Sequence, residues 1–158
     1  HYVRRLRENV KNIRVVDPDR VRDWASKQAA FISTDRKALA QQFDADYVLS
    51  LEVQDFEIQN PSNPGLFYGV GKVNTRVSQW GHPKDTRGKP DKSQPKEIDL
   101  VFETFDDIAF PEKQGPIQVD NLSRPAFYNK FVKLLATELS WHFTGRASGD
   151  DIQDLRGL

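Results

Sequence analysis

Two groups of aspartates are the residues of this chain best suited to acid–base or cation chemistry. Asp106 and Asp107 are adjacent at the end of a predicted strand, whereas Asp150, Asp151 and Asp154 lie near the end of the chain. Paired carboxylates can hold a cation or polarise a substrate, and they also occur at solvated strand ends. The second group lacks the spacing of an EF-hand loop, so we interpret it as a solubilising run of charge.

The three histidines do not form a recognisable catalytic or metal-binding pattern. His1 is terminal, His82 borders a polar loop, and His142 lies between two aromatic residues. None of them has the spacing of zinc ligands, and no serine lies in a nucleophile-elbow motif. The chain has no cysteine, which excludes thiol nucleophiles, disulfides and cysteine-bound metals. We therefore predict a protein that is not an enzyme and that has no metal and no cofactor.

Large apolar side chains beside turns are candidates of another kind. Leu66, Phe67 and Tyr68 follow a loop rich in proline and asparagine, and Trp80 lies at the far end of the same predicted strand. Residues of this type anchor protein, peptide or glycan partners, although they also cap the ends of sheets. We predict these four as partner-binding residues.

The composition narrows the class of protein. A length of 158 residues fits one domain, and 23 Lys and Arg balance 23 Asp and Glu. A net charge of zero argues against binding to a phosphate backbone, so no nucleic-acid partner is expected. No apolar run reaches the roughly 20 residues that cross a bilayer. Because the chain starts with His1 and has no methionine, we interpret it as an internal or processed fragment whose targeting segment was removed.

The first part of the chain predicts a helix, a strand and two more helices. Residues 3–10 carry apolar side chains at helical spacing, and residues 12–16 form a short β-branched run. Asp17 followed by proline starts a helix that is expected to end near residue 30. Another helix is expected over residues 35–43.

Three long strands follow. Residues 46–58 and 66–80 each change the parity of their apolar positions, near Gln54 in the first and at Gly69 and Gly71 in the second. We interpret them as one long, bent hairpin in which a β-bulge and two glycines permit the bend. The third strand, residues 97–109, has apolar residues on both faces, which is typical of a central or helix-covered strand.

The remaining segments are a polar loop, a helix and a tail. Residues 81–96 contain five Lys or Arg and two Asp, and their composition predicts a mobile loop. Residues 125–143 have the clearest apolar stripe in the chain and predict a helix. We expect residues 1–143 to form a single α/β domain and residues 144–158 to be a flexible C-terminal tail.

Together these elements predict an α+β protein, an α/β sandwich. Its sheet is expected to be mixed, mainly antiparallel and of about four strands, with three to four helices and one long bent β-hairpin. This arrangement is also similar to that of anticodon-binding domains, and the basic loop then gives a nucleic-acid-associated module as one alternative function.

The order of elements also resembles a family of small envelope domains. The segment VVDPDRVRDW near the start, ADYVLSLEVQDFEI at residues 45–58 and LFYGVGKVNTRVSQW at residues 66–80 carry the resemblance. The chain is similar over residues 1–143 to the curli-secretion lipoprotein, the outer-membrane activators of penicillin-binding proteins and the N-terminal domain of the Tol–Pal propeller protein. It has no lipidated cysteine, no pore-forming hairpins and no propeller.

The resemblance implies a location in the periplasm or at the outer membrane, with a lipid anchor upstream of His1. It also implies work by protein contact in envelope assembly or as a scaffold, with another envelope protein or a second copy as partner, and membrane contact only through that anchor. The alternative is a small-ligand-binding or hydrolytic envelope protein that uses Asp106 and Asp107.

Overall fold

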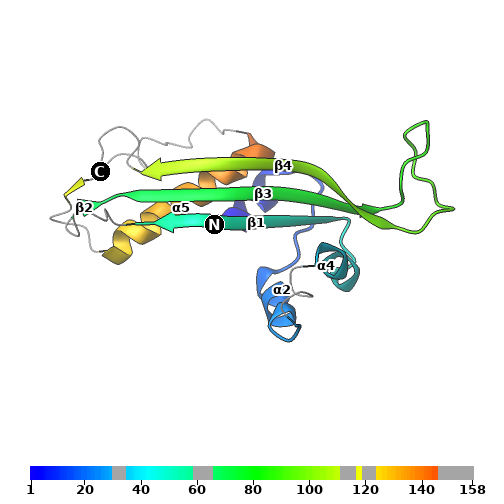
Figure 1. The fold of residues 1–158 in the computed structure, drawn as a ribbon, viewed down its shortest axis with the longest axis horizontal. Helices are drawn as coiled ribbons and strands as arrows, with labels where there is room; N and C mark the ends of the chain where they lie inside the picture. The colour runs from blue at the N-terminus through cyan, green and yellow to red at the C-terminus, as the bar shows by residue number, and fades with distance from the viewer. Residues whose placement is uncertain (30–34, 59–65, 111–116, 119–123, 146–158) are drawn as a thin grey trace. The chain divides into compact units, whose positions relative to one another are not determined.

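The computed structural model describes residues 1–29, 35–58, 66–110, 117–118 and 124–145, and they form a mixed α+β arrangement (Figure 1). In chain order the elements are α1 (Tyr2–Asn9), α2 (Pro18–Ala25), α4 (Arg36–Phe43), β1 (Tyr47–Glu57), β2 (Leu66–Phe67), β3 (Gly69–Gly81), β4 (Glu97–Phe110), β5 (Ile117–Gln118) and α5 (Arg124–Thr144). The long strands form an open antiparallel sheet in the order β1-β3-β4, and β2 pairs antiparallel with β5. The α+β class is confirmed; the described residues place three strands in the main sheet, not four.

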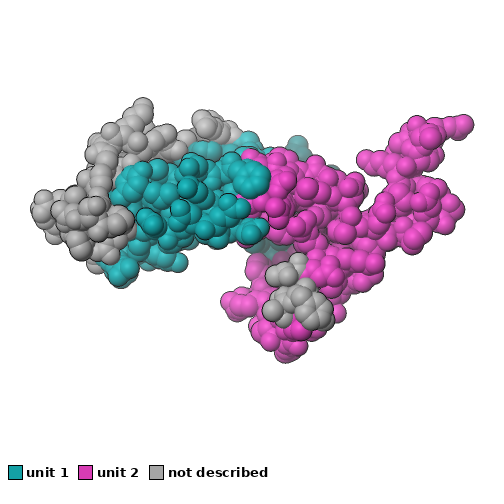
Figure 2. Space-filling model, viewed as in Figure 1, with its two compact units in different colours: residues 1–15, 52–73, 105–158 teal, residues 16–51, 74–104 magenta. Residues whose placement is uncertain are grey.

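The chain divides into two compact units, coloured separately in Figure 2. Unit 1 comprises residues 1–15, 52–73 and 105–158, and unit 2 comprises residues 16–51 and 74–104. Each of the three long strands contributes one part to each unit. The predicted flexible tail lies outside the described residues from residue 146 onward.

The core of unit 1 is built by α5 on one face of its strands. The predicted apolar stripe of α5 is buried from Phe127 to Leu139, and Phe127, Phe131 and Leu134 are fully enclosed, whereas Phe143 at its end is half-buried. Ile108 and Phe110 of β4 belong to the same cluster. Burial of each such side chain stabilises the fold by about 1.5–3 kcal/mol, so α5 carries much of the hydrophobic energy of this unit.

Two glycines of β3 allow α5 to lie close to the sheet. A Cβ atom at Gly69 would lie 2.8 Å from Cγ of Phe131, and one at Gly71 would lie 2.9 Å from Cδ2 of Leu135. Real Cβ atoms do not approach other heavy atoms so closely. The two glycines therefore leave space for side chains of α5. The predicted role was a different one, namely to permit a bend in the hairpin.

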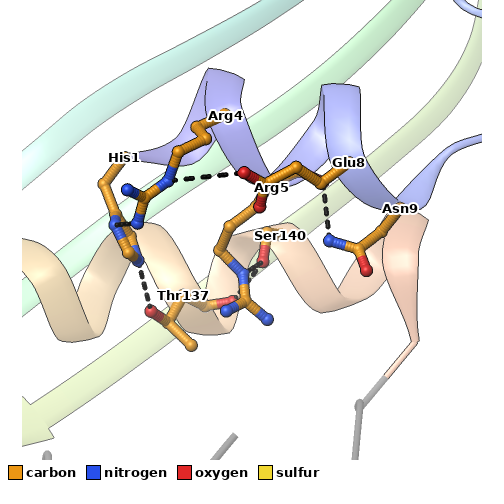
Figure 3. A network of polar contacts seen from close by, with 7 residues as sticks. All are labelled: His1, Arg4, Arg5, Glu8, Asn9, Thr137 and Ser140. Atoms are coloured by element: carbon orange, nitrogen blue, oxygen red, sulfur yellow. Dashed lines mark hydrogen bonds and ion pairs between the residues drawn. The ribbon is translucent and has the colours of Figure 1, made fainter.

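Helix α1 packs along α5, as Figure 3 shows. The Nε atom of Arg5 donates to Oγ of Ser140 at 2.8 Å, and Nε2 of His1 lies 3.2 Å from Oγ1 of Thr137. Leu6 of α1 is buried. The helix predicted from residues 3–10 is confirmed, and its partner is the helix farthest from it in the sequence.

The β-branched run at residues 12–16 is not a strand. Asn12 has a φ angle of 60°, which places it in a turn directly after α1. Ile13 is 42% exposed, and the carbonyl oxygen of Val15 accepts a hydrogen bond from Arg7. The prediction of a fourth strand is therefore wrong. The run has strand propensity, but it pairs with no neighbouring strand in the described part of the chain, and propensity alone does not form a strand.

Unit 2 contains the paired helices α2 and α4. Asp17 caps α2 as predicted, since its carboxylate accepts from the backbone N–H of Asp19 at 2.9 Å, but α2 ends at Ala25, earlier than expected. The rings of Trp24 and Phe43 meet edge to face at 5.9 Å and join the two helices.

The parity change in β1 has a different cause from the predicted bulge. Phe56 packs on the core of unit 1, whereas Leu51 is 40% exposed and Val53 is 57% exposed. The apolar residues before and after Gln54 therefore do not face one core, although the predicted bulge requires that they do. Simple alternation along a strand accounts for both sets.

Candidate functional site

The four predicted partner-binding residues are divided between the two units, with Leu66, Phe67 and Tyr68 in unit 1 and Trp80 in unit 2. Phe67 packs on the core of unit 1, where its ring stacks on Phe127 at 5.3 Å. Leu66 pairs through its backbone with β5, and its side chain lies outside the described residues; Tyr68 is half-buried. Trp80 belongs to unit 2 and is also half-buried. A partner-binding role for these four stays a prediction, and for Phe67 the structure adds a contact within the core.

Trp80 lies beside α4 in unit 2. The Nζ atom of Lys37 lies 5.9 Å from the centre of its ring, and the backbone N–H of Trp80 donates to the carbonyl oxygen of Asp46 at 2.7 Å. Arg36 of the same helix donates to Oγ of Ser78 at 3.2 Å. Trp80 thus helps to join α4 to the end of β3, which corresponds to the sheet-capping alternative.

Strand β4 carries three exposed apolar side chains. Residues 97–109 have apolar side chains on both faces, a pattern that predicts a central or helix-covered strand. In the structure β3 is the central strand and β4 lies at the edge of the sheet. Leu100 is 47% exposed, Val101 is 46% exposed and Phe105 is 65% exposed, so parts of both faces of β4 are uncovered. The alternative of a central strand is therefore wrong. The alternative of a helix-covered strand holds for one face of the end of β4, where Ile108 and Phe110 are buried in the cluster formed with α5.

In unit 1 the face of β4 opposite α5 is uncovered around Phe105. Asp106 and Ile108 point towards α5, so alternation directs Phe105 and Asp107 to the opposite face. Phe105 and Val53 are the most exposed apolar residues of the strands in this unit. We call the surface formed by Phe105 and Asp107 of β4, Val53 and Asp55 of β1 and Lys72 of β3 the open face of unit 1.

An ion pair lies on the same open face. Gly71 and Val73 of β3 face α5, so Lys72 between them points the other way. Its Nζ atom lies 3.7 Å from a carboxylate oxygen of Asp55, and both side chains are about half exposed. Such an exposed pair contributes little stability, about 0–1 kcal/mol. The open face therefore combines a large exposed aromatic ring with an exposed ion pair.

The predicted carboxylate pair is separated by the strand. Asp106 points towards α5, where its two carboxylate oxygens lie 2.9 and 3.0 Å from Nε2 of His142, and the side chains are 20% and 28% exposed. Asp107 lies on the opposite side. Sequence reasoning missed the partnership of Asp106 with His142, because 36 residues separate them and only helix packing brings them together. A carboxylate can orient an imidazole for proton transfer, and it can equally join a strand to a helix.

The negative charge of Asp106 also acts on Tyr2. Its hydroxyl oxygen is buried and finds no hydrogen-bond partner among the residues that the structure describes. Burial raises the pKa of Tyr2 far above its usual range, and the negative charge of Asp106 raises it further. The phenol therefore stays protonated where an exposed tyrosine would ionise.

The substitution Tyr2→Phe is expected to leave the free energy of unfolding at neutral pH unchanged or raised by up to about 1 kcal/mol, since it removes a buried hydroxyl without a partner. The pKa of Tyr2 is raised in the folded state, so the contribution of the protonated phenol to the free energy of unfolding is fully present below about pH 10, the ordinary pKa of tyrosine. This contribution is lost as the pH rises above that value, because the unfolded chain then ionises first. Urea unfolding at neutral and alkaline pH measures both effects, and the variant should lose less stability at alkaline pH. A clear loss at neutral pH would show that the hydroxyl has a partner.

In unit 2 a second carboxylate is held by two donors. Arg76 donates from Nε to Glu103 at 2.6 Å, and the amide of the fully buried Asn74 donates to the same oxygen at 3.1 Å. The hydrogen bond from Arg76 is the main cause that lowers the pKa of Glu103, and that from Asn74 is the next. Glu103 is thus held as a carboxylate by structural partners.

Two kinds of site are not found in the described part of the chain. It holds no group of three or more His, Cys, Asp or Glu that could bind a metal ion. No helix among the described residues is long and apolar enough to cross a membrane. Comparison with family models, curated proteins and solved structures gave no match, so the surfaces described above are the basis for assigning a role.

Proposed function

We propose that this chain is a non-enzymatic protein-interaction domain of a bacterial cell-envelope protein, and that it binds its partner through the open face of unit 1. The observation that carries the proposal is the 65% exposure of Phe105 on an edge strand. Within the described residues β4 pairs only with β3, so its other edge presents backbone groups that a partner strand can use.

The energetics favour a bound state for this surface. Transfer of a phenylalanine side chain from water into an apolar contact is worth about 1.5–3 kcal/mol, which is the size of a strong interface contribution. Protein chains commonly protect an edge strand with charge or with a covering element. Asp107 supplies one such protective charge, whereas Phe105 places an exposed apolar ring on the same strand. The exposed ring therefore has a use outside the core.

The envelope location of the proposal rests on the resemblance to the small α/β domain of envelope lipoproteins. The α+β class and the neighbouring positions of β1 and β3 are compatible with the fold that this resemblance implies. Fractionation of the cells that produce the protein tests this part. Recovery in the periplasm or with the outer membrane is expected, and a cytosolic protein would contradict it.

The partner contact can be tested by site-specific photocrosslinking in those cells. A photoreactive amino acid at position 105 is expected to give a discrete adduct with one partner protein. The same amino acid at Asn129, an exposed position on α5, serves as the control. Equal labelling from both positions, or none from position 105, would exclude the open face as the contact.

The substitution Phe105→Thr is expected to separate binding from folding. Threonine retains strand propensity, so the free energy of unfolding should change by less than about 1 kcal/mol. Affinity for the crosslinked partner should fall at least about tenfold, because the anchor side chain is lost. Denaturant unfolding and calorimetric titration with the identified partner give the two quantities. A stable variant that binds as well as the wild type would contradict the proposal.

A hydrolytic role is the second candidate, and only the pairing of Asp106 with His142 favours it. It would require the imidazole to accept a proton from water or from a hydroxyl group, with the carboxylate orienting the ring. Turnover of an activated ester that disappears in His142→Ala and persists in Phe105→Thr would favour this role over the interaction domain.

A further inference from the structure

The segment that connects β3 and β4 in unit 2 is strongly basic and structured. Five cations lie in the exposed part of residues 81–96, and none has an ion-pair partner among the residues that the structure describes. They are Lys84, Arg87, Lys89, Lys92 and Lys96. The segment has two aspartates, so it carries a surplus of three positive charges in a chain whose net charge is zero. Figure 1 shows it extending beyond the ends of β3 and β4. We call residues 84–96 the basic loop.

One aspartate organises the first turn of the basic loop. The carboxylate of Asp85 accepts hydrogen bonds from the backbone N–H groups of Arg87 at 2.8 Å and Lys89 at 2.9 Å. The backbone N–H of Asp85 donates to the carbonyl of Lys89, and Gly88 between them has a φ angle of 75°. A short bridge between Lys84 and Pro90 closes the turn. Three of the cations are thus presented on a defined turn.

The other aspartate organises the second turn. Asp91 accepts from the backbone N–H of Ser93 at 3.0 Å, from its hydroxyl at 2.6 Å and from the amide of Gln94 at 3.1 Å. These hydrogen bonds lower the pKa of Asp91. The backbone N–H of Asp91 also donates to the carbonyl of Pro83 at 2.8 Å. Both carboxylates of the loop therefore hold its backbone. The prediction of a mobile loop used composition alone, and composition does not show the hydrogen bonds that Asp85 and Asp91 accept.

The side chains of the basic loop restrict the ligand to one that is recognised by charge. Residues 84–96 contain no aromatic and no aliphatic side chain larger than proline. Proteins that bind single-stranded nucleic acid combine positive charge with aromatic rings on which bases stack. This loop offers no such ring, and it has no apolar side chain that could enter a hydrocarbon layer. Several cations without apolar anchors are suited to attraction to phosphate groups at an anionic surface.

We propose that the basic loop is a peripheral membrane contact that binds the phosphate groups of anionic phospholipids. A planar array of headgroups allows several cations on one ordered loop to act together, and each Lys or Arg near an anionic surface raises membrane partitioning roughly fivefold. The inference is independent of the open face of unit 1, because it uses other residues and another chemistry. It adds a membrane contact that belongs to the domain itself, beyond the anchor expected upstream.

The test is sedimentation of the whole chain with vesicles of phosphatidylcholine, with or without phosphatidylglycerol. Binding is expected only with phosphatidylglycerol, and it should weaken as salt is raised. The triple variant Lys84→Gln, Arg87→Gln and Lys89→Gln should bind roughly 100-fold more weakly. A matched triple variant, Lys11→Gln, Arg14→Gln and Lys133→Gln, removes the same charge from exposed positions of unit 1 and should bind like the wild type.

Three outcomes would overturn the proposal. The first is equal loss in the two triple variants, which would indicate a general charge effect. The second is equal binding to vesicles without phosphatidylglycerol. The third is tighter binding to a labelled RNA or to inorganic phosphate than to the anionic vesicles. Circular dichroism and denaturant unfolding of the variants confirm that folding is retained.

A single substitution distinguishes binding that needs the ordered turn from binding that depends only on net charge. Asp85→Ala raises the net charge by one, so attraction by charge alone would strengthen binding to the anionic vesicles. It also removes the hydrogen bonds that shape the first turn. If the ordered turn presents the cations together, binding should instead fall severalfold. Stronger binding by this variant would contradict an ordered contact.

Discussion

Replacement of Phe131 by alanine is expected to lower the free energy of unfolding by about 3–5 kcal/mol, a large share of the stability of a domain of this size. The Phe131 ring is fully buried and meets the ring of Phe56 at 5.4 Å. It also fills the space over Gly69. Removal of the ring leaves a cavity that the strand and the helix cannot both close, which adds to the lost transfer energy.

Urea unfolding followed by circular dichroism measures this effect. The control is Val132→Ala, the next residue of α5, which is 38% exposed. It should change the free energy of unfolding by less than about 1 kcal/mol, because an exposed helix position loses little burial and alanine favours the helix. Similar losses in the two variants would contradict the assignment of Phe131 to the centre of the core.

The substitution Gly69→Ala is expected to cost about 1–3 kcal/mol, although alanine suits a strand better than glycine does. The new Cβ atom would lie within 3 Å of three ring atoms of Phe131, and a rigid ring cannot bend away as a flexible chain end can. Gly81→Ala is the control, since a Cβ atom at that position would meet no other side chain or backbone atom within 4 Å. It should be neutral in the same unfolding measurement.

The close approach makes the two sites interdependent. Gly69→Ala in a Phe131→Leu background should cost less than in the wild type, because the smaller, flexible side chain leaves room for the methyl group. A coupling of about 0.5–3 kcal/mol is typical of residues in contact. Strict additivity in the double-mutant cycle would mean that the glycine has a purely conformational role.

The elements predicted best from sequence are those with strong local signals. The apolar stripe of residues 125–143 yields α5 (Arg124–Thr144), and Asp17 with Pro18 correctly marks the start of α2. These signals work because helix periodicity and caps depend on neighbours a few residues away. The run at residues 12–16 shows the limit, since β-branched residues favour a strand only where another strand pairs with them.

The candidate surfaces are less accessible to sequence reasoning. The place of Phe67 beside a turn predicts a partner contact, and the structure packs its ring on Phe127. The pattern around Phe105 predicts a covered strand, yet this residue is the most exposed aromatic side chain described. Whether an apolar side chain is covered depends on which elements pack on its face of the sheet, and that is a property of the whole fold.

The composition and spacing of the chain determined the α+β class, the long helices and strands, the absence of cysteine chemistry and the charge surplus of residues 81–96. Only the tertiary structure decided that Asp106, and not its neighbour Asp107, contacts His142. It also decided that Gly69 leaves space for the ring of Phe131, and that the carboxylate of Asp85 holds the backbone of a basic turn. The reason is physical: periodicity and charge are properties of short segments, whereas burial and pairing are set by segments far apart in the chain.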